Sequence, residues 1–372
     1  MGAPDRRAWL KLAGMAALGA GAACAARRTP VGATRRLAAP HLTPGRVVRT
    51  AVGLRPYRPA GFVVGSERLG DKTIVHHYGH GGAGITLSWG TAALALEGAA
   101  VTGEKRAAII GAGAVGLATA ISFQRAGWSV SIHARELPPA TTSNLAAALW
   151  SPFAVYDPAF APEGFEARHA HACRIAHRAF QDLAGPRFGI RWIESYELGD
   201  APIADRGPRA AQSPVRDLFP GLRDLAASES PFTFAHTRRF FTMLVEPATY
   251  LRSLLDEAVA RGATVEVRAF ASPAEILTLP EPVIVNCTGL GSKTLFGDEG
   301  LVPMQGQIAI LLPEPEVDYV TLCGDFTMVP RSDGIVLGGT YRLGDAALTV
   351  DPEATRRIMT GNAGVADRLR RF

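Results

Sequence analysis

The chain has 372 residues, 47% of them hydrophobic and 20% charged, which is enough for one large or two interlocked globular domains with a sizeable core. Its net charge of +5 is not gathered in a basic stripe with interleaved aromatic residues, which argues against nucleic-acid binding. The 4 cysteines have no short spacing, which argues against a zinc ribbon and a dense disulfide framework.

The N-terminus, residues 1–25, is expected to be an export signal outside the fold. Arg6 and Arg7 precede a short apolar run, an arrangement that resembles a twin-arginine signal. The run is shorter than the roughly 20 apolar residues that span a bilayer, and an amphipathic helix is the alternative. Lipidation at Cys24 is the weaker option, because Gly21 stands where a lipoprotein signal usually carries Leu. We expect a protein in the periplasm or outside the cell, without a stable membrane span once the signal is cleaved.

Residues 26–45 are polar and interrupted by prolines, which predicts a linker. After short strand patterns, residues 79–84 read Gly-His-Gly-Gly-Ala-Gly, a glycine-rich turn that opens a predicted helix over 85–99.

A second glycine-rich turn lies near the middle of the first half of the chain. It reads Gly111-Ala-Gly113-Ala-Val-Gly116, after a β-branched apolar strand and before a helical pattern. Gly111 permits the tight turn, Gly113 lets the backbone approach phosphates, and Gly116 lets the helix lie close to the strand. A strand over 129–133 completes a β-α-β unit, so we expect a dinucleotide site; a glycine-rich turn in another kind of α/β protein is the alternative.

The remaining patterns alternate between helix and strand, which predicts an α/β fold. Helices are expected at 163–183, 247–261 and 352–372. Strands are expected at 46–52, 62–65, 73–77, 191–198, 235–241, 264–269, 283–286, 305–312, 326–330 and 335–341.

Several stretches carry a more specific signal when taken together. They are GAGAVGL at 111–117, TTSNLAAALW at 141–150, VIVNCTG at 283–289, GLRPYRP at 53–59 with HHYGHGGAGITLSWG at 76–90, and GGTYRLGD at 338–345. The chain thereby resembles the D-amino-acid oxidase family of FAD-dependent flavoproteins from about residue 45 onward. The resemblance implies a Rossmann-type FAD-binding domain interlocked with a mixed-sheet α+β substrate domain.

The order of these motifs differs from that of the family. The GLRP and GHGG segments close the chain in the family, whereas here they open it. The sequence therefore resembles a circular permutation, rejoined through residues 97–106, and chain termini that lie close together make such a change tolerable. On this basis the FAD-binding parts are expected at about 72–150 and 245–295. The substrate-domain parts are expected at about 46–71, 151–244 and 296–372.

The resemblance implies FAD as the cofactor and assigns its contacts. The acidic partner of the adenosine ribose is the least clear, because Ala134 holds its usual place; Glu136 is the candidate, and a solvated surface carboxylate is the alternative. The implied cofactor-binding residues are Gly111, Gly113, Val115, Gly116, Arg135, Glu136, Thr141, Thr142, Ser143, Leu149, Thr288, Gly81, Gly82, Gly84, Ile85 and Thr86.

For the substrate, the resemblance implies that Arg55 binds the carboxylate, Tyr341 hydrogen-bonds the same group and the Gly82 carbonyl accepts from the amine. A surface arginine and a core or rim tyrosine are the alternative interpretations. The chain departs from the family at Thr327, where other members carry a tyrosine, and Phe326 or Tyr319 are the candidates to fill that space.

The implied reaction is oxidative deamination of D-amino acids by hydride transfer to flavin, giving 2-oxo acids, ammonia and, with oxygen, hydrogen peroxide. Alternatives are a glycine or secondary-amine oxidase, a dehydrogenase of the same family, and a flavin-binding protein without turnover. A small D-amino acid and oxygen are the expected partners, no metal is expected, and a homodimer is left open.

Overall fold

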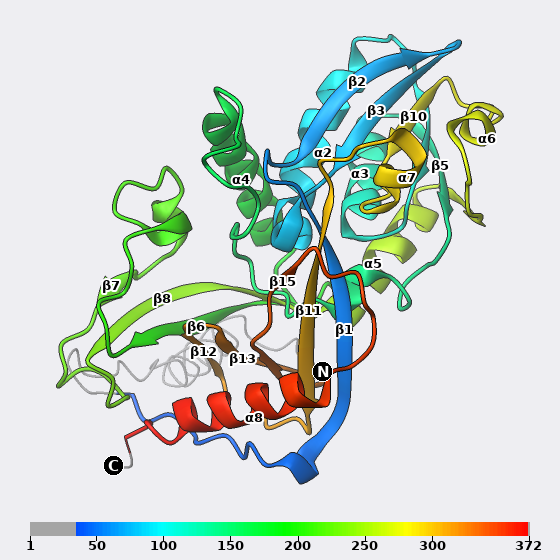
Figure 1. The fold of residues 1–372 in the computed structure, drawn as a ribbon. Helices are drawn as coiled ribbons and strands as arrows, with labels where there is room; N and C mark the ends of the chain where they lie inside the picture. The colour runs from blue at the N-terminus through cyan, green and yellow to red at the C-terminus, as the bar shows by residue number, and fades with distance from the viewer. Residues whose placement is uncertain (1–34, 371–372) are drawn as a thin grey trace, which may run out of the picture. The chain divides into compact units, whose positions relative to one another are not determined.

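The computed structural model of the protein describes residues 35–370, which form two β-sheets with helices around them (Figure 1). The expected export signal lies outside the described residues. The larger sheet has 9 strands. In spatial order these are β1 (Val47–Tyr57), β11 (Val302–Leu311), β14 (Gly334–Gly338), β13 (Phe326–Arg331), β12 (Tyr319–Cys323), β6 (Ile190–Gly199), β8 (His236–Val245) and β7 (Arg223–Asp224), with β15 (Arg342–Leu343) beside β11.

The second sheet has 6 strands and a parallel centre, as a dinucleotide-binding domain requires. Its order is β2 (Val63–Leu69), β3 (Lys72–Tyr78), β10 (Val283–Asn286), β4 (Arg106–Ile110), β5 (Ser129–Ala134) and β9 (Thr264–Val267).

Both faces of this sheet are covered, so its central strands are apolar on both sides. On one face Val75, Ile109 and Val285 belong to a cluster that includes side chains of α2 (Gly84–Ala100), α3 (Ala114–Arg125), α4 (Phe165–Asp182) and α5 (Pro247–Ala260). On the other face Ile74 and Ile284 pack with α6 (Pro273–Leu277) and α7 (Gly291–Phe296).

The early part of the chain is built into the same sheet as the central glycine-rich unit. β10 pairs in parallel with β3 on one side, Val285 opposite Val75, and with β4 on the other. The expected domain boundary at residue 71 is wrong, because β2 forms an antiparallel hairpin with β3 and therefore belongs to the same 6-stranded sheet.

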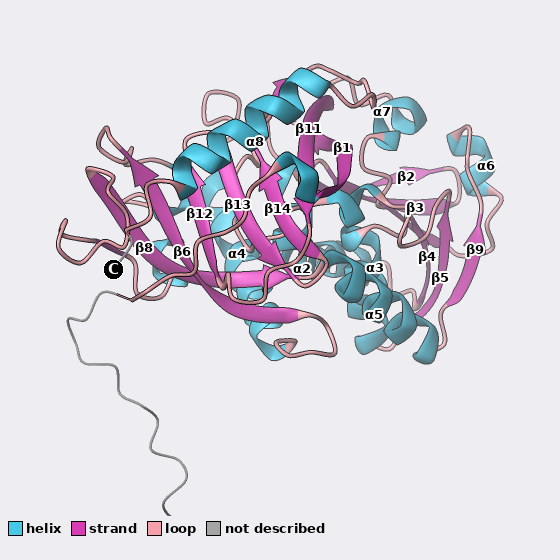
Figure 2. Ribbon diagram, turned by 90° about the horizontal axis from the view of Figure 1, so that it is seen from below, coloured by secondary structure: helices cyan, strands magenta, loops and turns pink. Residues whose placement is uncertain are grey.

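Helix α8 (Pro352–Ala366) covers one face of the larger sheet, lying across β12, β13 and β14 in Figure 2. Its Ile358 and Met359 pack with Leu337 and Met328 of the strands. The later half of the expected linker packs against the same cluster, since Leu37, Ala38 and Leu42 contact it and the Tyr319 hydroxyl donates to the Ala38 carbonyl at 2.9 Å.

Most predicted elements agree with the observed ones to within a few residues. The differences are at element ends and in short elements. The last helix ends at Ala366, and the strand expected to reach Tyr341 ends at Gly338. The short helices α6 and α7 and the short strands β7, β12 and β15 are not among the predicted elements. Within residues 35–370 no helix is long and apolar enough to cross a bilayer.

Candidate active site

The second glycine-rich turn, at 111–116, has the geometry that its sequence predicts. Gly111 has a φ of +116°, and a Cβ there would lie 2.5 Å from the Cys287 carbonyl oxygen. A Cβ at Gly116 would lie 1.9 Å from the Gly111 carbonyl oxygen, so α3 can approach the strand only with glycine at this position. The first intrahelical hydrogen bond joins the Leu117 N–H to the Gly113 carbonyl at 3.0 Å. The amides of Val115 and Gly116 precede it and point from the positive end of α3, as an anion site requires.

The hydroxyl-rich loop at 141–150 lies against this helix end. The Ser143 hydroxyl accepts from the Ala114 N–H at 3.1 Å, and a Cβ at Gly113 would lie 3.2 Å from that hydroxyl. Thr142 and Ser143 belong to a short 3-10 helix, η3 (Thr142–Leu145), while Thr141 donates to the Asn144 side chain at 2.8 Å. The structure therefore brings together the predicted pyrophosphate turn and the predicted hydroxyl loop.

The earlier glycine-rich turn is held against the end of the same loop. Gly81 has a φ of +55°, and a Cβ there would meet the Ala154 carbonyl at 2.2 Å. The Gly82 N–H donates to that carbonyl at 3.0 Å, and Thr86 accepts from the Ser151 N–H at 3.1 Å. Gly84, Ile85 and Thr86 form the first turn of α2, and the Thr86 hydroxyl donates to the Leu149 carbonyl at 3.4 Å. Ala154, whose φ is +54°, is a residue that the sequence analysis missed, since no local motif marks an alanine in this conformation.

Parallel strand order explains why these turns meet. β3, β10 and β4 are parallel neighbours, so their carboxyl ends lie at the same edge of the sheet. β3 leads into the turn at 79–84, β10 into Cys287–Gly289 and β4 into the turn at 111–116. Thr288, at the end of β10, donates to the Asn286 side chain at 2.7 Å and contacts the Ser292 hydroxyl at 2.8 Å. The predicted cofactor residues thus share one edge of the sheet.

Arg135 and Glu136 leave the same carboxyl edge of the sheet, because β5 pairs in parallel with β4 and Ile110 lies opposite His133. They follow β5, are exposed, and form an ion pair at 3.6 Å. Nothing in this contact favours ribose binding over a solvated surface carboxylate, so the assignment of Glu136 stays a prediction.

A buried, neutral cluster lies beneath the earlier turn. His77 contacts the Thr119 hydroxyl at 3.0 Å, and His80 contacts the Thr91 hydroxyl at 2.9 Å. Burial lowers the pKa of His80 to about 3 and raises the pKa of the Cys287 thiol to about 12. These side chains are therefore uncharged at neutral pH and supply neither a cationic group nor a thiolate nucleophile.

Arg55 lies on β1, the long strand that pairs with β11 along its whole length (Figure 1). Its guanidinium lies 4.7 Å from the centroid of the Tyr341 ring, so the structure brings together the two residues that the resemblance assigns to the carboxylate. Nη1 of Arg55 is buried and has no hydrogen-bond partner within residues 35–370. Gly53, two residues earlier, approaches the hydroxyl loop, because a Cβ there would lie 3.5 Å from the Leu145 side chain. Strand β1, which carries Arg55, and the hydroxyl-rich loop at 141–150 are therefore in contact.

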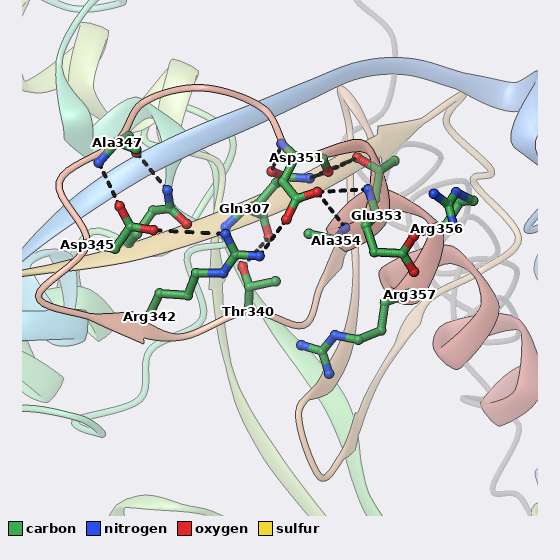
Figure 3. A network of polar contacts seen from close by, with 12 residues as sticks. Gln307, Thr340, Arg342, Asp345, Ala347, Asp351, Glu353, Ala354, Arg356 and Arg357 are labelled. Carbon is green, nitrogen blue, oxygen red and sulfur yellow. Dashed lines mark hydrogen bonds and ion pairs between the residues drawn. The ribbon is translucent and has the colours of Figure 1, made fainter.

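The segment that carries Tyr341 is anchored by polar contacts rather than by a long strand (Figure 3). Arg342 pairs with Asp351 at 2.5 Å, Gln307 donates to the Asp351 carbonyl at 2.8 Å, and Gln305 donates to the Ala347 carbonyl at 2.7 Å. These contacts fix both ends of the loop between β15 and α8.

Neither candidate aromatic fills the space at Thr327. Thr327 pairs with Gly338, whereas the neighbouring Phe326 packs on the opposite, α8-covered face, against Gly339 and Gly361. Tyr319 is buried on that same face. The expectation that Phe326 or Tyr319 occupies the substrate side is therefore wrong, because strand alternation turns both away.

Comparison with known proteins identifies the family. Residues 106–367 match the model of the "FAD dependent oxidoreductase" family. A D-amino-acid oxidase of Rubrobacter xylanophilus is 32% identical over 271 residues, which cover 71% of this chain and 78% of the relative. The chain belongs to the D-amino-acid oxidase family of FAD-dependent oxidoreductases. A human D-aspartate oxidase is 28% identical over 68% of this chain and 74% of its own length.

Solved structures show the same fold for this oxidoreductase. Glycine oxidase from Bacillus cereus superposes with a TM-score of 0.52 at 16% identity, covering 70% of this chain and 78% of that chain. L-proline dehydrogenase from P. horikoshii superposes with a TM-score of 0.53 at 13% identity, covering 71% and 77%.

The cofactor of this oxidoreductase is FAD, and the residues present fit it. Glycines are required at 111 and 116 because a Cβ would strike backbone oxygens, and the first-turn amides of α3 suit a pyrophosphate. The buried Asn144 amide nitrogen has no partner among the described residues and lies in the same loop.

Proposed function

We propose that this protein catalyses the oxidative deamination of D-amino acids to 2-oxo acids, ammonia and hydrogen peroxide. The observation that carries the proposal is Arg55, whose buried Nη1 has no partner in the described chain and whose strand contacts the cofactor loop. A planar guanidinium with free edge donors suits a substrate carboxylate. Relatives that match 68–71% of the chain carry the names D-amino-acid oxidase and D-aspartate oxidase.

The resemblance to the family assigns the roles of the chain's own residues in this proposal. Arg55 binds the carboxylate, and the Gly82 carbonyl accepts a hydrogen bond from the amine. FAD supplies the acceptor for the hydride that leaves the α-carbon. The amine is neutral, so loss of hydride and of one N–H proton leaves an imino acid, which water hydrolyses to a 2-oxo acid and ammonia. Oxygen takes up the two electrons and two protons as hydrogen peroxide. Orientation of the substrate, rather than a side-chain base, accelerates the reaction.

The test is a substrate panel with the purified yellow holoprotein. We expect peroxide release with D-alanine and none with L-alanine. Release only with glycine or sarcosine would replace the proposal with a glycine or secondary-amine oxidase. Flavin reduction under nitrogen without peroxide in air would indicate a dehydrogenase, and a yellow protein inert to the whole panel would indicate a flavin-binding protein without turnover.

We also propose that the chain is circularly permuted relative to its family. The match to the family model begins at Arg106, which leaves β1, β2, β3 and α2 ahead of it, although β3 lies beside β10 in the FAD-type sheet. The ends of the described chain share one cluster, which contains both Leu369 and Leu37. A join between these ends and a cut near Gly103, in the turn between α2 and β4, would restore the family order.

Finally, we propose export by the twin-arginine route to the periplasm or the exterior. Support comes from Arg6 and Arg7 ahead of a short apolar run. Since this route carries folded proteins, it suits an enzyme that must bind FAD before export. A fusion of residues 1–35 to a reporter should be exported, and the double substitution Arg6→Lys with Arg7→Lys should retain the reporter in the cytoplasm; export that is unaffected would contradict the proposal.

A further inference from the structure

An arginine of the larger sheet reaches the hydroxyl-rich loop at 141–150. Arg331 is the last residue of β13, and its side chain is only 1% exposed. Its Nη1 donates to the Ala146 carbonyl at 2.8 Å, while Nε and Nη2 donate to the two carboxylate oxygens of Asp333 at 2.8 Å and 2.7 Å. A bidentate pair restricts the rotation of a guanidinium, so Asp333 keeps Nη1 directed at the Ala146 carbonyl.

Ala146 connects this arginine to the glycine-rich turn at 111–116. The Ala146 N–H donates to the Ser143 carbonyl at 3.4 Å, at the end of η3. The Ser143 hydroxyl in turn accepts from the Ala114 N–H at 3.1 Å, in the first turn of α3. A continuous series of hydrogen bonds therefore runs from β13 to the helix end whose free amides suit the pyrophosphate.

The turn that follows Arg331 is itself anchored. The N–H of the next residue, Ser332, donates to the Glu246 carboxylate at 3.0 Å, and Glu246 is a buried residue that immediately precedes α5. Residues 148–150 of the loop bind the backbone of β8. The larger sheet thus holds the end of the loop through β8, and Arg331 adds a contact to the part of the loop next to Ser143.

We infer that Arg331 is a positioning residue for FAD, which acts through the Ala146 carbonyl to hold η3 and the Ser143 hydroxyl at the N-terminus of α3. Without this donor we expect η3 to be less ordered before FAD binds, and the entropy lost in ordering it then lowers the affinity. The inference concerns the cofactor alone, so it holds or fails independently of which amine the protein oxidises.

Arg331→Met tests the inference, because methionine is an unbranched side chain that donates no hydrogen bond. The FAD-free protein is titrated with FAD, and binding is followed by flavin fluorescence, while circular dichroism checks that the protein is folded. We expect the Kd for FAD to rise about tenfold or more, the loss that accompanies removal of a hydrogen bond from a charged donor.

Arg191→Met is the matched control. Arg191 of β6 donates from Nη2 to the carbonyl of Pro330, the residue before Arg331, at 2.6 Å, and it makes no hydrogen bond to the loop at 141–150 within residues 35–370. This variant removes the same kind of hydrogen bond to the same strand, so it should leave the Kd for FAD within about twofold of the starting protein. If Arg331→Met also stays within about twofold, Arg331 does not position the cofactor.

Ser143→Ala separates positioning from a general effect on the fold. If Arg331 acts on FAD through Ser143, adding Arg331→Met to Ser143→Ala should weaken FAD binding by less than about threefold further, so that the double-mutant cycle is strongly non-additive. Losses that multiply in the double variant would mean that Arg331 acts by another route, and would overturn the inference. Should Arg331→Met not fold, Arg331→Gln, which is also uncharged but polar, enters the same titration and cycle with the same expected outcomes.

Discussion

At the scale of single residues, Arg55 combines burial with an unused donor, and its replacement gives the clearest outcome. Arg55→Lys keeps the positive charge but loses the planar fork that meets both carboxylate oxygens. We expect kcat/KM for D-alanine to fall about 10- to 100-fold, since hydrogen bonds to charged groups contribute about 1.5–3 kcal/mol. FAD content, read from the absorbance spectrum, should not change; an unchanged kcat/KM would remove Arg55 from the site.

The positions of site residues that belong to a motif could be predicted from the sequence. Residues that approach a motif only through strand pairing could not. Arg55, Gly111 and Gly81 lie in stretches whose spacing states a role, and the structure brings their segments together. Arg331 has no such signal, because its contact with Ala146 depends on the register of β13 and joins segments 185 residues apart in the chain. The orientation of Phe326, which faces α8, depends likewise on strand register.

At the scale of elements, the close approach of α3 to β4 depends on Gly116. Gly116→Ala places a methyl 1.9 Å from the Gly111 carbonyl oxygen, a backbone atom that cannot move aside cheaply. We expect a loss of about 1–3 kcal/mol in the free energy of unfolding, as in overpacked cores, and loss of bound FAD. Urea unfolding and the ratio of flavin to protein measure both.

The matched control is Gly98→Ala in α2, where a Cβ would meet no heavy atom of the described chain within 4 Å. Alanine favours a helix over glycine by about 0.5–1 kcal/mol, so this variant should be slightly more stable and keep its flavin. Equal behaviour of the two variants would contradict the packing argument.

The bounds of elements with a clear hydrophobic periodicity were predicted closely, whereas short elements without such a pattern were not predicted. The pattern at 247–261 predicts a helix that the structure begins at Pro247 and ends at Ala260. The strand at 319–323 has 5 residues and lies between turns, so its local pattern was too short to separate it from a loop. Its position is determined by parallel pairing with β6, a contact between distant segments.

At the scale of the whole molecule, buried neutral histidines couple stability to pH. Burial lowers the pKa of His80 to about 3 and that of His77 well below the value near 6.5 of an unfolded chain. Between the folded and the unfolded pKa of each histidine, the unfolded chain binds more protons than the folded chain. The free energy of unfolding is therefore highest above pH 6.5 and decreases as the pH falls toward 3, by up to about 1.4 kcal/mol per pH unit for each histidine.

The urea midpoint of the holoprotein should therefore fall between about pH 7.5 and about pH 5. His80→Gln removes one of the titrating groups while leaving a side-chain amide near the Thr91 hydroxyl, which His80 contacts at 2.9 Å. This variant should lose less stability on acidification than the starting protein. An equal loss would mean that other groups, and not this buried cluster, carry the pH dependence.

The order of segments along the chain can itself be changed if the molecule is a circular permutation. The two ends of the described chain are linked by a short series of contacts. The Arg370 N–H donates to the Pro231 carbonyl at 2.8 Å, and the ring of the next residue, Phe232, lies 6.2 Å from that of Tyr319 between centroids. The Tyr319 hydroxyl donates to the Ala38 carbonyl. A linker of about six residues, which spans up to about 20 Å, is expected to join residue 370 to Arg36. A chain that begins at Lys105, passes through this linker and ends at Thr102 should fold, bind FAD and keep its KM for D-alanine within about threefold, because every pairing of both sheets is retained.

The control carries the same linker but is cut at Gly79, inside a glycine-rich turn, and should lose flavin. Loss of flavin in both chains, measured by absorbance after purification, would contradict the permutation.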